Sequence, residues 1–202
     1  MNRAIGKIVN MYEPGMELEI RNYISIEEFV KKAKELIKDE YSISQSVSII
    51  GNVRKESIYK NGKRDHVIYQ KKTKIIDYIN RGKFKIALSK EEPVNEQKIL
   101  PEIIRTKNRV SVIIGDWRHD FTLVKTIHKE SFGQLKSIVS KEMKHITLND
   151  WYDIIPMEIN SMNKAEYEIE FVGEELTVDK IHSMLMGNKY KSMMLGKISK
   201  MI

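Results

Sequence analysis

The chain has 202 residues, enough for one domain with a sizeable core, and its 41% hydrophobic and 31% charged content is typical of a globular protein. No apolar run approaches the roughly 20 residues of a membrane span, and the lack of cysteine excludes disulfides and thiolate metal sites. The net charge of +7 favours polyanionic partners, although a lysine-rich solvated surface explains such a charge equally well.

The N-terminal part of the chain predicts one strand and one helix. The first residues lead into no long apolar segment, so we expect an intracellular protein without a signal peptide. In the strand, about residues 16–21, Glu17 and Glu19 alternate with large apolar residues, which puts both carboxylates on one face. A capping-box pattern that begins at Ser25 precedes an amphipathic helix over roughly 26–38.

The middle of the chain, from about 43 to 125, is typical of strands joined by short turns. Asn61-Gly62 is the strongest hairpin signal in the sequence, and Gly115-Asp116 marks a second turn. The alternating segments that predict strands are 46–50, 54–59, 67–74, 84–89, 109–114 and 117–124. Such a meander predicts an antiparallel sheet or barrel.

The last third of the chain is less regular. Residues 133–145 weakly predict a helix, and we assign no role to the segment 126–165 as a whole. A second acidic strand follows at 166–172, in which Glu166, Glu168 and Glu170 alternate with apolar residues. Thr177 then caps a final helix. Because no linker or repeat interrupts the chain, residues 1–202 are expected to form a single domain.

The polar faces of these strands are sorted by charge. A row of like charges on one strand face is unfavourable unless positive charge lies in front of it. We therefore interpret the two glutamate rows as facing each other across a divalent cation, Mg²⁺ or Mn²⁺, which prefers hard oxygen ligands. The sets that share a face are Glu17 with Glu19; Glu166, Glu168 and Glu170; Lys107, Arg109 and Ser111; Arg118, Asp120 and Thr122; and Gln70, Lys72 and Lys74.

Each set has a simpler explanation when taken alone. A single pair of glutamates on a strand is usually solvent-facing, and two bases at alternate positions carry almost no information. The order and spacing of all the sets together favour a barrel that grips a triphosphate with its metal ion, because lysine and arginine neutralise phosphate oxygens while glutamates hold the cation. His119 should point away from Asp120, and Trp117, Trp151 and Tyr152 are expected in the core or the wall.

With these residues identified, the chain resembles the triphosphate tunnel metalloenzymes, and within them the RNA 5′-triphosphatase of mRNA capping systems in fungi and large DNA viruses. The likeness rests on motifs spread from about residue 16 to 172. These motifs are Glu17 and Glu19 in the first strand; Phe84 to Pro93, ending in an acidic residue that we take as Glu91; Lys107 to Ser111; Asp120 to Lys125; and Glu166, Glu168 and Glu170 in the last strand.

The resemblance implies a fold, an activity and a set of site residues. The fold would be a closed eight-stranded antiparallel β-barrel with flanking helices, and the activity would be removal of the γ-phosphate from nascent mRNA before cap formation. The metal ligands would be Glu17, Glu19, Glu166, Glu168 and Glu170, and the catalytic residues would be Glu17, Glu19, Glu168, Glu170 and Arg109. The substrate-binding residues would be Arg54, Lys72, Lys74, Glu91, Lys107, Arg109, Asp120, Thr122 and Lys125.

Partners and alternatives follow from the same resemblance. The substrate would be 5′-triphosphate RNA or a nucleoside triphosphate, and an mRNA guanylyltransferase would act on the product. One alternative keeps the superfamily but changes the substrate to tripolyphosphate, thiamine triphosphate or a nucleotide. Another is a non-catalytic β-barrel that binds nucleic acid or a protein partner through its basic surface, with the glutamate rows on the outside.

Overall fold

The computed structural model describes residues 2–80, 83–99, 101–158 and 163–185. The chain divides into two compact units, one formed by Gly15–Val172 and the other by Met1–Pro14 together with Gly173–Ile202. The single domain expected over residues 1–202 therefore stays a prediction. None of the described helices combines the length and the apolar character that a membrane crossing requires.

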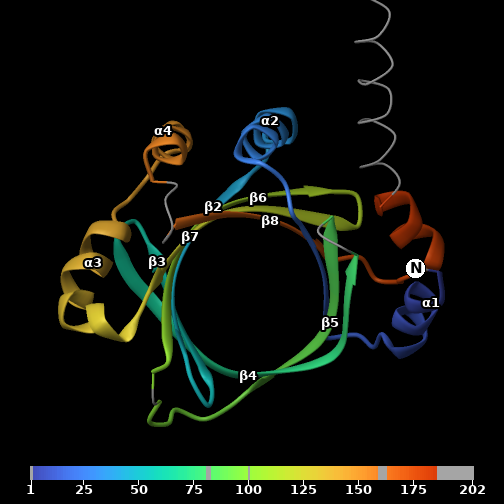
Figure 1. Cartoon of the computed structure of the whole chain (residues 1–202), viewed down its shortest axis with the longest axis horizontal. Coiled ribbons are helices and arrows are strands. Elements are labelled where there is room, and N and C mark those ends of the chain that lie inside the picture. Colours follow the sequence, from blue (N-terminus) through green and yellow to red (C-terminus); the bar gives the residue numbers. More distant parts are fainter. Residues whose placement is uncertain (1, 81–82, 100, 159–162, 186–202) are drawn as a thin grey trace, which may run out of the picture. The chain divides into compact units, whose positions relative to one another are not determined.

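The larger unit is a closed antiparallel β-barrel of eight strands, as predicted, and Figure 1 shows the strands as a ring seen end-on. Around the ring the strands follow the order β1-β5-β4-β3-β2-β6-β7-β8, so the first and last strands are neighbours. The strands are β1 (Met16–Asn22), β2 (Ser42–Ile50), β3 (Arg54–Lys60), β4 (Lys63–Asn80), β5 (Phe84–Pro93), β6 (Ile103–Ile114), β7 (Trp117–Ile127) and β8 (Asn163–Phe171).

Two tight turns confirm the hairpin signals of the sequence. Between β3 and β4, Asn61 and Gly62 have φ values of 52° and 76°, and a two-residue turn with both central φ angles positive matches the twist of the strands that it joins. Between β6 and β7, Gly115 has φ of 58°. A residue with a Cβ atom is strained in this region, which explains glycine at both places.

Helices cover parts of the outer surface of the barrel (Figure 1). Under α3 (Leu135–Glu142), Val47, Ile104 and Ile127 form a hydrophobic cluster with Met143. On β2, β6 and β7, every second residue counted from Val47, Ile104 and Ile127 therefore faces outward, and the residues between them face inward. A 3₁₀ helix, η1 (Lys129–Gln134), precedes α3, so the helix predicted over 133–145 is shorter than expected.

An aromatic cluster joins two further helices to the barrel wall. Phe29 of α2 (Ile26–Leu36) lies 5.5 Å from Phe121 of β7 and 5.9 Å from Trp151 of α4 (Leu148–Glu158), measured between ring centroids. Ser25 caps α2 in the predicted capping box. The sequence did not predict α4, although Thr147 and Asp150 bond to each other's backbone amides in a capping pattern.

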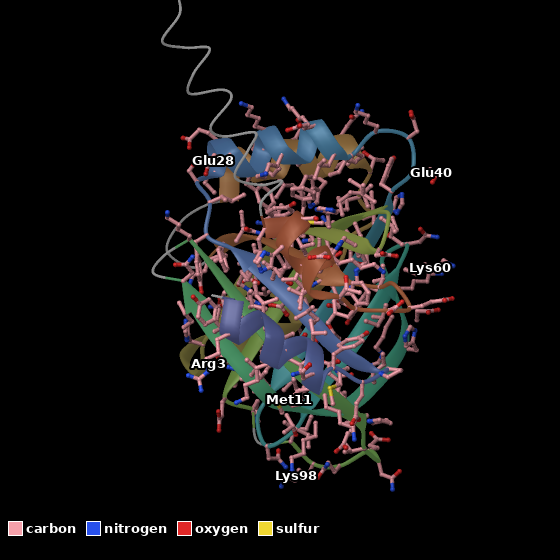
Figure 2. The ribbon with its side chains drawn as sticks, turned by 90° about the vertical axis from the view of Figure 1, so that its right-hand side faces the viewer. Arg3, Met11, Glu28, Glu40, Lys60 and Lys98 are labelled. Carbon is pink, nitrogen blue, oxygen red and sulfur yellow. The ribbon has the colours of Figure 1, made fainter. Side chains whose placement is uncertain are left out.

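Charged side chains at the periphery contrast with those inside the barrel. Glu28, Glu40 and Lys60 are exposed and project outward in Figure 2.

In the smaller unit, α1 (Asn2–Met11) buries Ile5 and Ile8. Thr177 caps a helix that starts at residue 178, since the Thr177 hydroxyl accepts a hydrogen bond from the Lys180 amide at 3.2 Å. This cap was predicted.

Candidate active site

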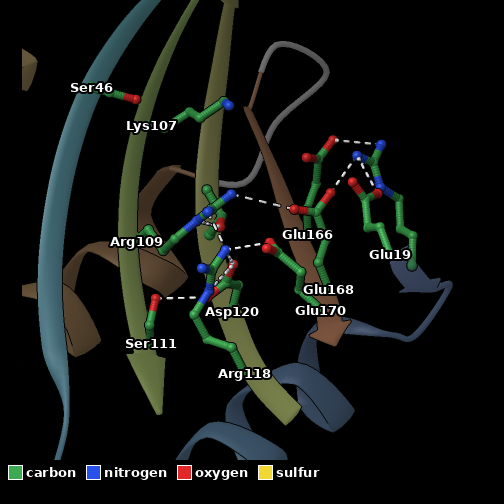
Figure 3. A network of polar contacts seen from close by, with 12 residues as sticks. Glu19, Ser46, Lys107, Arg109, Ser111, Arg118, Asp120, Glu166, Glu168 and Glu170 are labelled. Atoms are coloured by element: carbon green, nitrogen blue, oxygen red, sulfur yellow. Dashed lines mark hydrogen bonds and ion pairs between the residues drawn. The ribbon is translucent and has the colours of Figure 1, made fainter. Parts of the chain in front are cut away.

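The two glutamate rows meet where the barrel closes. Strand β1 pairs with β8 in a register that sets Glu19 opposite Glu170 and Arg21 opposite Glu168. Cross-strand partners project on the same side of a sheet, so the carboxylates of both rows share one face. In Figure 3 the side chains of Glu168 and Glu170 point toward Arg109 and Arg118 of β6 and β7.

The register of all eight strands assigns the rest of this inward face. Glu168 lies opposite Asp120, and Glu166 opposite Thr122, on β7; Thr122 in turn lies opposite Arg109 on β6. Continuing around the ring in this way gives a face made mostly of polar residues. Besides the residues of β1, β7 and β8, it includes Ser42, Ser44, Ser46, Ser48, Arg54, Glu56, Gln70, Lys72, Lys74, Lys85, Ser89, Glu91, Arg105, Lys107, Arg109 and Ser111.

The acidic wall formed by β1 and β8 carries crowded negative charge. Burial, and then the nearby carboxylate of Glu168, raise the pKa of Glu19 to about 7. Burial also raises the pKa of Glu170 to about 7, with Glu17 and Asp120 adding to the effect against the opposing Arg118. These carboxyl groups therefore hold protons far more readily than glutamates in water, which marks the wall as a place where a cation is favoured.

Arg21 is the cation that lies within this wall. Its guanidinium contacts Glu168 directly and lies 3.2 Å from Glu19 and 3.7 Å from Glu166. Although burial opposes it, these three carboxylates raise the pKa of Arg21, so the arginine stays charged. Arg21 was not among the residues selected from the sequence, although this arginine continues the alternation that begins at Glu17.

Asp120 organises the β7 side of the site (Figure 3). It is almost fully buried, with 1% of its surface exposed, and accepts a hydrogen bond from the Ser111 hydroxyl at 2.6 Å. The guanidinium groups of Arg109 and Arg118 both lie 3.0 Å from its carboxylate. Arg118 also contacts Glu170, so one aspartate connects a cation of β6 to the last glutamate of β8.

The β6 cations face both walls. Arg109 donates to Thr122 at 3.0 Å and lies 3.3 Å from Glu168. Lys107 lies 3.6 Å from Glu56 of β3, which also accepts hydrogen bonds from Ser46 at 2.7 Å and Ser48 at 3.1 Å. Burial would raise the pKa of Glu56, but Lys107 and Arg54 outweigh it and lower that pKa to about 2.

Positive charge crowds together at this point. Burial lowers the pKa of Lys107, and the neighbouring Arg54 and Arg109 lower it further, while Glu56 opposes them. Lys107 and Arg109 are successive inward-facing residues of β6, so the two cations are direct neighbours on this face. A corner where three cations repel one another favours an anion with several oxygens, such as a phosphate.

The opposite wall links the acidic and basic regions through Lys72 and Glu91. Lys72 contacts Glu17 and lies 3.4 Å from Glu91 and 3.9 Å from Glu19. Glu91 in turn lies 3.3 Å from Arg54 and accepts a hydrogen bond from Gln70 at 2.8 Å. Glu91, the acidic residue that the sequence analysis selected at the end of its strand, thus lies beside two of the predicted phosphate-binding residues.

Not every selected residue joins the cluster. Lys125 has the parity of the outward-facing residues of β7 and binds Glu142 of α3 at 2.8 Å. Lys74 shares the inward parity, but its side chain is 61% exposed and pairs with Asp77 at 3.4 Å. We therefore leave Lys125 out of the phosphate-binding proposal, because a cation outside the wall cannot reach a ligand held inside it.

Several inward residues were not selected as site residues from the sequence. These are Arg21, Glu56, Lys85, Arg105, Arg118 and the serines of β2. The serines at 42, 44, 46 and 48 recur at a period of two, which was a readable signal, and the last three lie opposite Arg109, Lys107 and Arg105. As expected, His119 points away from Asp120: it is buried on the outer face, where Nδ1 lies 2.7 Å from the Tyr167 hydroxyl.

The donor set of the acidic wall fits a hard divalent cation. Glu17, Glu19, Glu168 and Glu170 supply only carboxylate oxygens, which Mg²⁺ and Mn²⁺ prefer. Burial raises the pKa values of Glu19 and Glu170, and neighbouring carboxylates add to the effect. Within the described residues, no three histidine, aspartate or glutamate side chains already converge on one point. Arg21, Lys72 and Arg118 bind the carboxylates, so a divalent cation would compete with them for these oxygens.

Comparison with known proteins supports the fold. The structure is similar to that of the S. pombe Pct1 RNA triphosphatase, with a TM-score of 0.51, and to that of the same enzyme in complex with the Spt5 CTD, with a TM-score of 0.53. In both cases the identity is 13%, and the alignment covers 85% of this chain and 76% of the other. No family model and no curated protein matches the sequence. The chain thus has the barrel fold seen in an RNA triphosphatase.

Proposed function

We propose that this protein is a divalent-metal-dependent polynucleotide 5′-triphosphatase, which releases the γ-phosphate of nascent mRNA in the first step of cap formation. One observation carries the proposal: glutamate rows on the neighbouring strands β1 and β8 share the inward face of a closed barrel with Lys107 and Arg109 of β6. The fold shared with an RNA triphosphatase supports it. The same residues would also accept a nucleoside triphosphate.

The acidic wall would hold the metal ion. Glu17, Glu19, Glu168 and Glu170, with Glu166 at the edge of the wall, are the candidate ligands for Mg²⁺ or Mn²⁺. When bound there, the ion supplies Lewis-acid polarisation of the terminal phosphoryl group. Arg21, Lys72 and Arg118 then act as second partners of the ligating carboxylates and hold their orientation.

The basic corner would bind the phosphates. Arg54, Lys107 and Arg109 offer N–H donors that neutralise the charge on the phosphate oxygens, charge that spreads as the terminal phosphoryl group is transferred. Glu56 and Asp120 fix Lys107 and Arg109 in place through their ion pairs. Lys74 lies on the same inward face and would contribute near its exposed end.

Water is the second reactant. A carboxylate of the acidic wall would orient the attacking water and accept its proton. The bond between the β–γ bridging oxygen and the γ-phosphorus breaks, and the products are inorganic phosphate and an RNA with a diphosphate end. That product is the form on which an mRNA guanylyltransferase would act.

Phosphate release from purified protein tests the proposal. The full chain is incubated with 5′-triphosphate RNA in Mg²⁺, in Mn²⁺ and in EDTA, and free phosphate is measured. We expect release with a divalent ion and none in EDTA. No release from RNA, ATP or tripolyphosphate under any of these conditions would contradict it and favour a non-catalytic barrel, although the inward position of the glutamates counts against that alternative.

One alternative within the same chemistry has support of its own. The cations of the basic corner would bind phosphate whatever group carries it, so tripolyphosphate, thiamine triphosphate or a free nucleotide would bind there too. The rates on tripolyphosphate, ATP and triphosphate-ended RNA separate these substrates. An enzyme with its highest kcat/KM on tripolyphosphate would be a polyphosphate hydrolase rather than an RNA triphosphatase.

A further inference from the structure

The inward face of β6 carries a third cation that the ion-pair network does not use. Arg105, Lys107 and Arg109 lie at alternate positions, opposite Ser48, Ser46 and Ser44 of β2. Arg109 is paired with Asp120 and Glu168, and Lys107 with Glu56. Among the residues that the structure describes, no carboxylate forms an ion pair with Arg105.

The Nε atom of Arg105 is also without a partner. It is buried and donates no hydrogen bond to any described residue. The Nε atoms of Arg21 and Arg54 share this property, but the terminal nitrogens of both side chains are bound to carboxylates. Buried donors in native proteins are nearly always hydrogen-bonded, so an arginine on a polar inner face with neither bond nor ion pair points to an anionic ligand.

The position of Arg105 along β6 indicates which anion. Successive residues on one face of a strand are separated by two rises of about 3.3 Å each, or about 6.6 Å. Adjacent phosphates of a triphosphate share a bridging oxygen, so their phosphorus atoms lie closer together than two successive residues on one strand face. The distance from Lys107 to Arg109 therefore matches the length of a whole triphosphate. Arg105 lies one step further along β6 from Asp120 and the glutamates of β8, and therefore beyond a triphosphate bound by Lys107 and Arg109.

We propose that Arg105 forms a subsite for the first phosphodiester of a 5′-triphosphate RNA, the phosphate that a ribose separates from the triphosphate. A guanidinium suits this group because its paired N–H donors match two phosphate oxygens. The subsite makes the protein prefer a polynucleotide to a free nucleotide or tripolyphosphate. It rests on the proposed triphosphatase function and deepens it.

The test compares substrates that differ by one phosphodiester. Phosphate release with Mn²⁺ is measured for a nucleoside triphosphate, the corresponding 5′-triphosphate dinucleotide, and tripolyphosphate. In the wild type, kcat/KM rises from the mononucleotide to the dinucleotide. In Arg105→Gln the ratio of kcat/KM on the dinucleotide to kcat/KM on the mononucleotide should be lower than in the wild type by about tenfold or more. This is the loss expected when one charge-assisted hydrogen bond is removed. Arg105→Lys keeps the charge but not the paired donors, so it retains part of the gain.

A matched control and a second readout separate a contact from a general effect. Arg64→Gln removes the same charge from an exposed position at the start of β4 and should keep the dinucleotide gain. For longer RNA, the slope of log KM against log salt becomes shallower by about 0.7 in Arg105→Gln, as expected when one phosphate contact is lost. If Arg105→Gln does not fold, the comparison of wild type with Arg105→Lys decides.

The outcomes distinguish this inference from the proposed function. Phosphate release without any gain from mononucleotide to dinucleotide, or a loss in Arg105→Gln that is equal on all three substrates, overturns the subsite and leaves the triphosphatase assignment standing. No phosphate release by the wild type from any substrate overturns the proposed function, and the subsite with it.

Discussion

Glu19 of β1 and Glu170 of β8 are cross-strand partners at the seam where the barrel closes, and burial raises the pKa of each to about 7. Two residues that are 151 positions apart, 170 minus 19, are thus held side by side by the closure alone. Like charges directly opposite one another destabilise a sheet, so their persistence indicates a function that needs them together.

Removal of a glutamate from either row should abolish phosphate release. Glu17→Ala and Glu168→Ala are expected to lose at least about 100-fold in kcat, the range seen when one preorganised electrostatic group is removed. Both variants should keep the wild-type circular dichroism spectrum. Glu92→Ala, at an exposed position on β5, is the matched control. Normal turnover by either of the first two variants would contradict the metal-site assignment.

The same crowding predicts an effect on stability without metal. In EDTA at pH 8, Glu19→Gln should be more stable than the wild type by about 1–3 kcal/mol, because the variant removes a buried charge that repels Glu168. Urea unfolding measures the difference. Mn²⁺ should stabilise the wild type more than the variant, since only the wild type has the full set of carboxylates. A large loss of stability in EDTA would instead indicate a structural role.

Glu56 is expected to act as a positioning residue for Lys107. Its carboxylate raises the pKa of that lysine against burial, Arg54 and Arg109, so Glu56→Gln should lower the pKa of Lys107 further. We predict a loss of about tenfold in kcat/KM, roughly the value of one charge-assisted hydrogen bond, that grows as the pH rises. The pH–rate profile checks this. Ser46→Ala keeps the Glu56–Lys107 ion pair, so the fall of its kcat/KM at high pH should occur at the same pH as in the wild type.

His119 predicts how stability depends on pH. Burial and the nearby Lys32 lower the pKa of His119 to about 4, against the opposing Asp120, whereas the unfolded chain has the ordinary value of 6.5. The unfolded state therefore binds more protons between these values, and the stability present above pH 6.5 is lost as pH falls toward 4. The loss from this group is about 1.4 kcal/mol at pH 5.5 and up to about 3 kcal/mol at pH 4.

Paired variants isolate the contribution of His119 from those of the acidic residues. His119→Gln keeps a hydrogen-bonding group near the Tyr167 hydroxyl but cannot be protonated, so its free energy of unfolding should fall less than that of the wild type between pH 7 and pH 5. His66→Gln changes an exposed position and serves as the reference. Parallel curves for the wild type and His119→Gln would show that the pKa of His119 is the same in the folded and the unfolded protein, and would contradict this prediction.

Most of the strands were predictable because alternation is a local property. The period of two placed Glu17 with Glu19, and Lys107 with Arg109, on common faces, and Asn61-Gly62 marked a turn that only positive φ angles allow. The same rule explains Lys125: it lies five positions from Asp120, and an odd separation on a regular strand puts two residues on opposite faces. The family resemblance implied that Lys125 binds the substrate, although its position in the strand puts it on the outer face.

Helix α4 and the ion pairs were harder to predict for different reasons. The helix begins at a Thr147–Asp150 cap that the irregular composition of the segment obscured, and its Trp151 is stabilised by packing on Phe29. Arg118, by contrast, was noted beside Asp120 but not selected, since an arginine next to an acid has no distinctive spacing. Its role becomes visible only where β7 lies against β8 and Glu170 comes within reach.

The sequence by itself determined which side chains of each strand share a face, because backbone pleating repeats every two residues whatever the rest of the chain does. Only the tertiary structure decided which strands are neighbours, and hence that Glu19 lies opposite Glu170 and that Arg105 has no acidic partner among the described residues. Pairing between distant strands depends on closing long loops and burying the outer faces under α2, α3 and α4, and no local pattern encodes that choice.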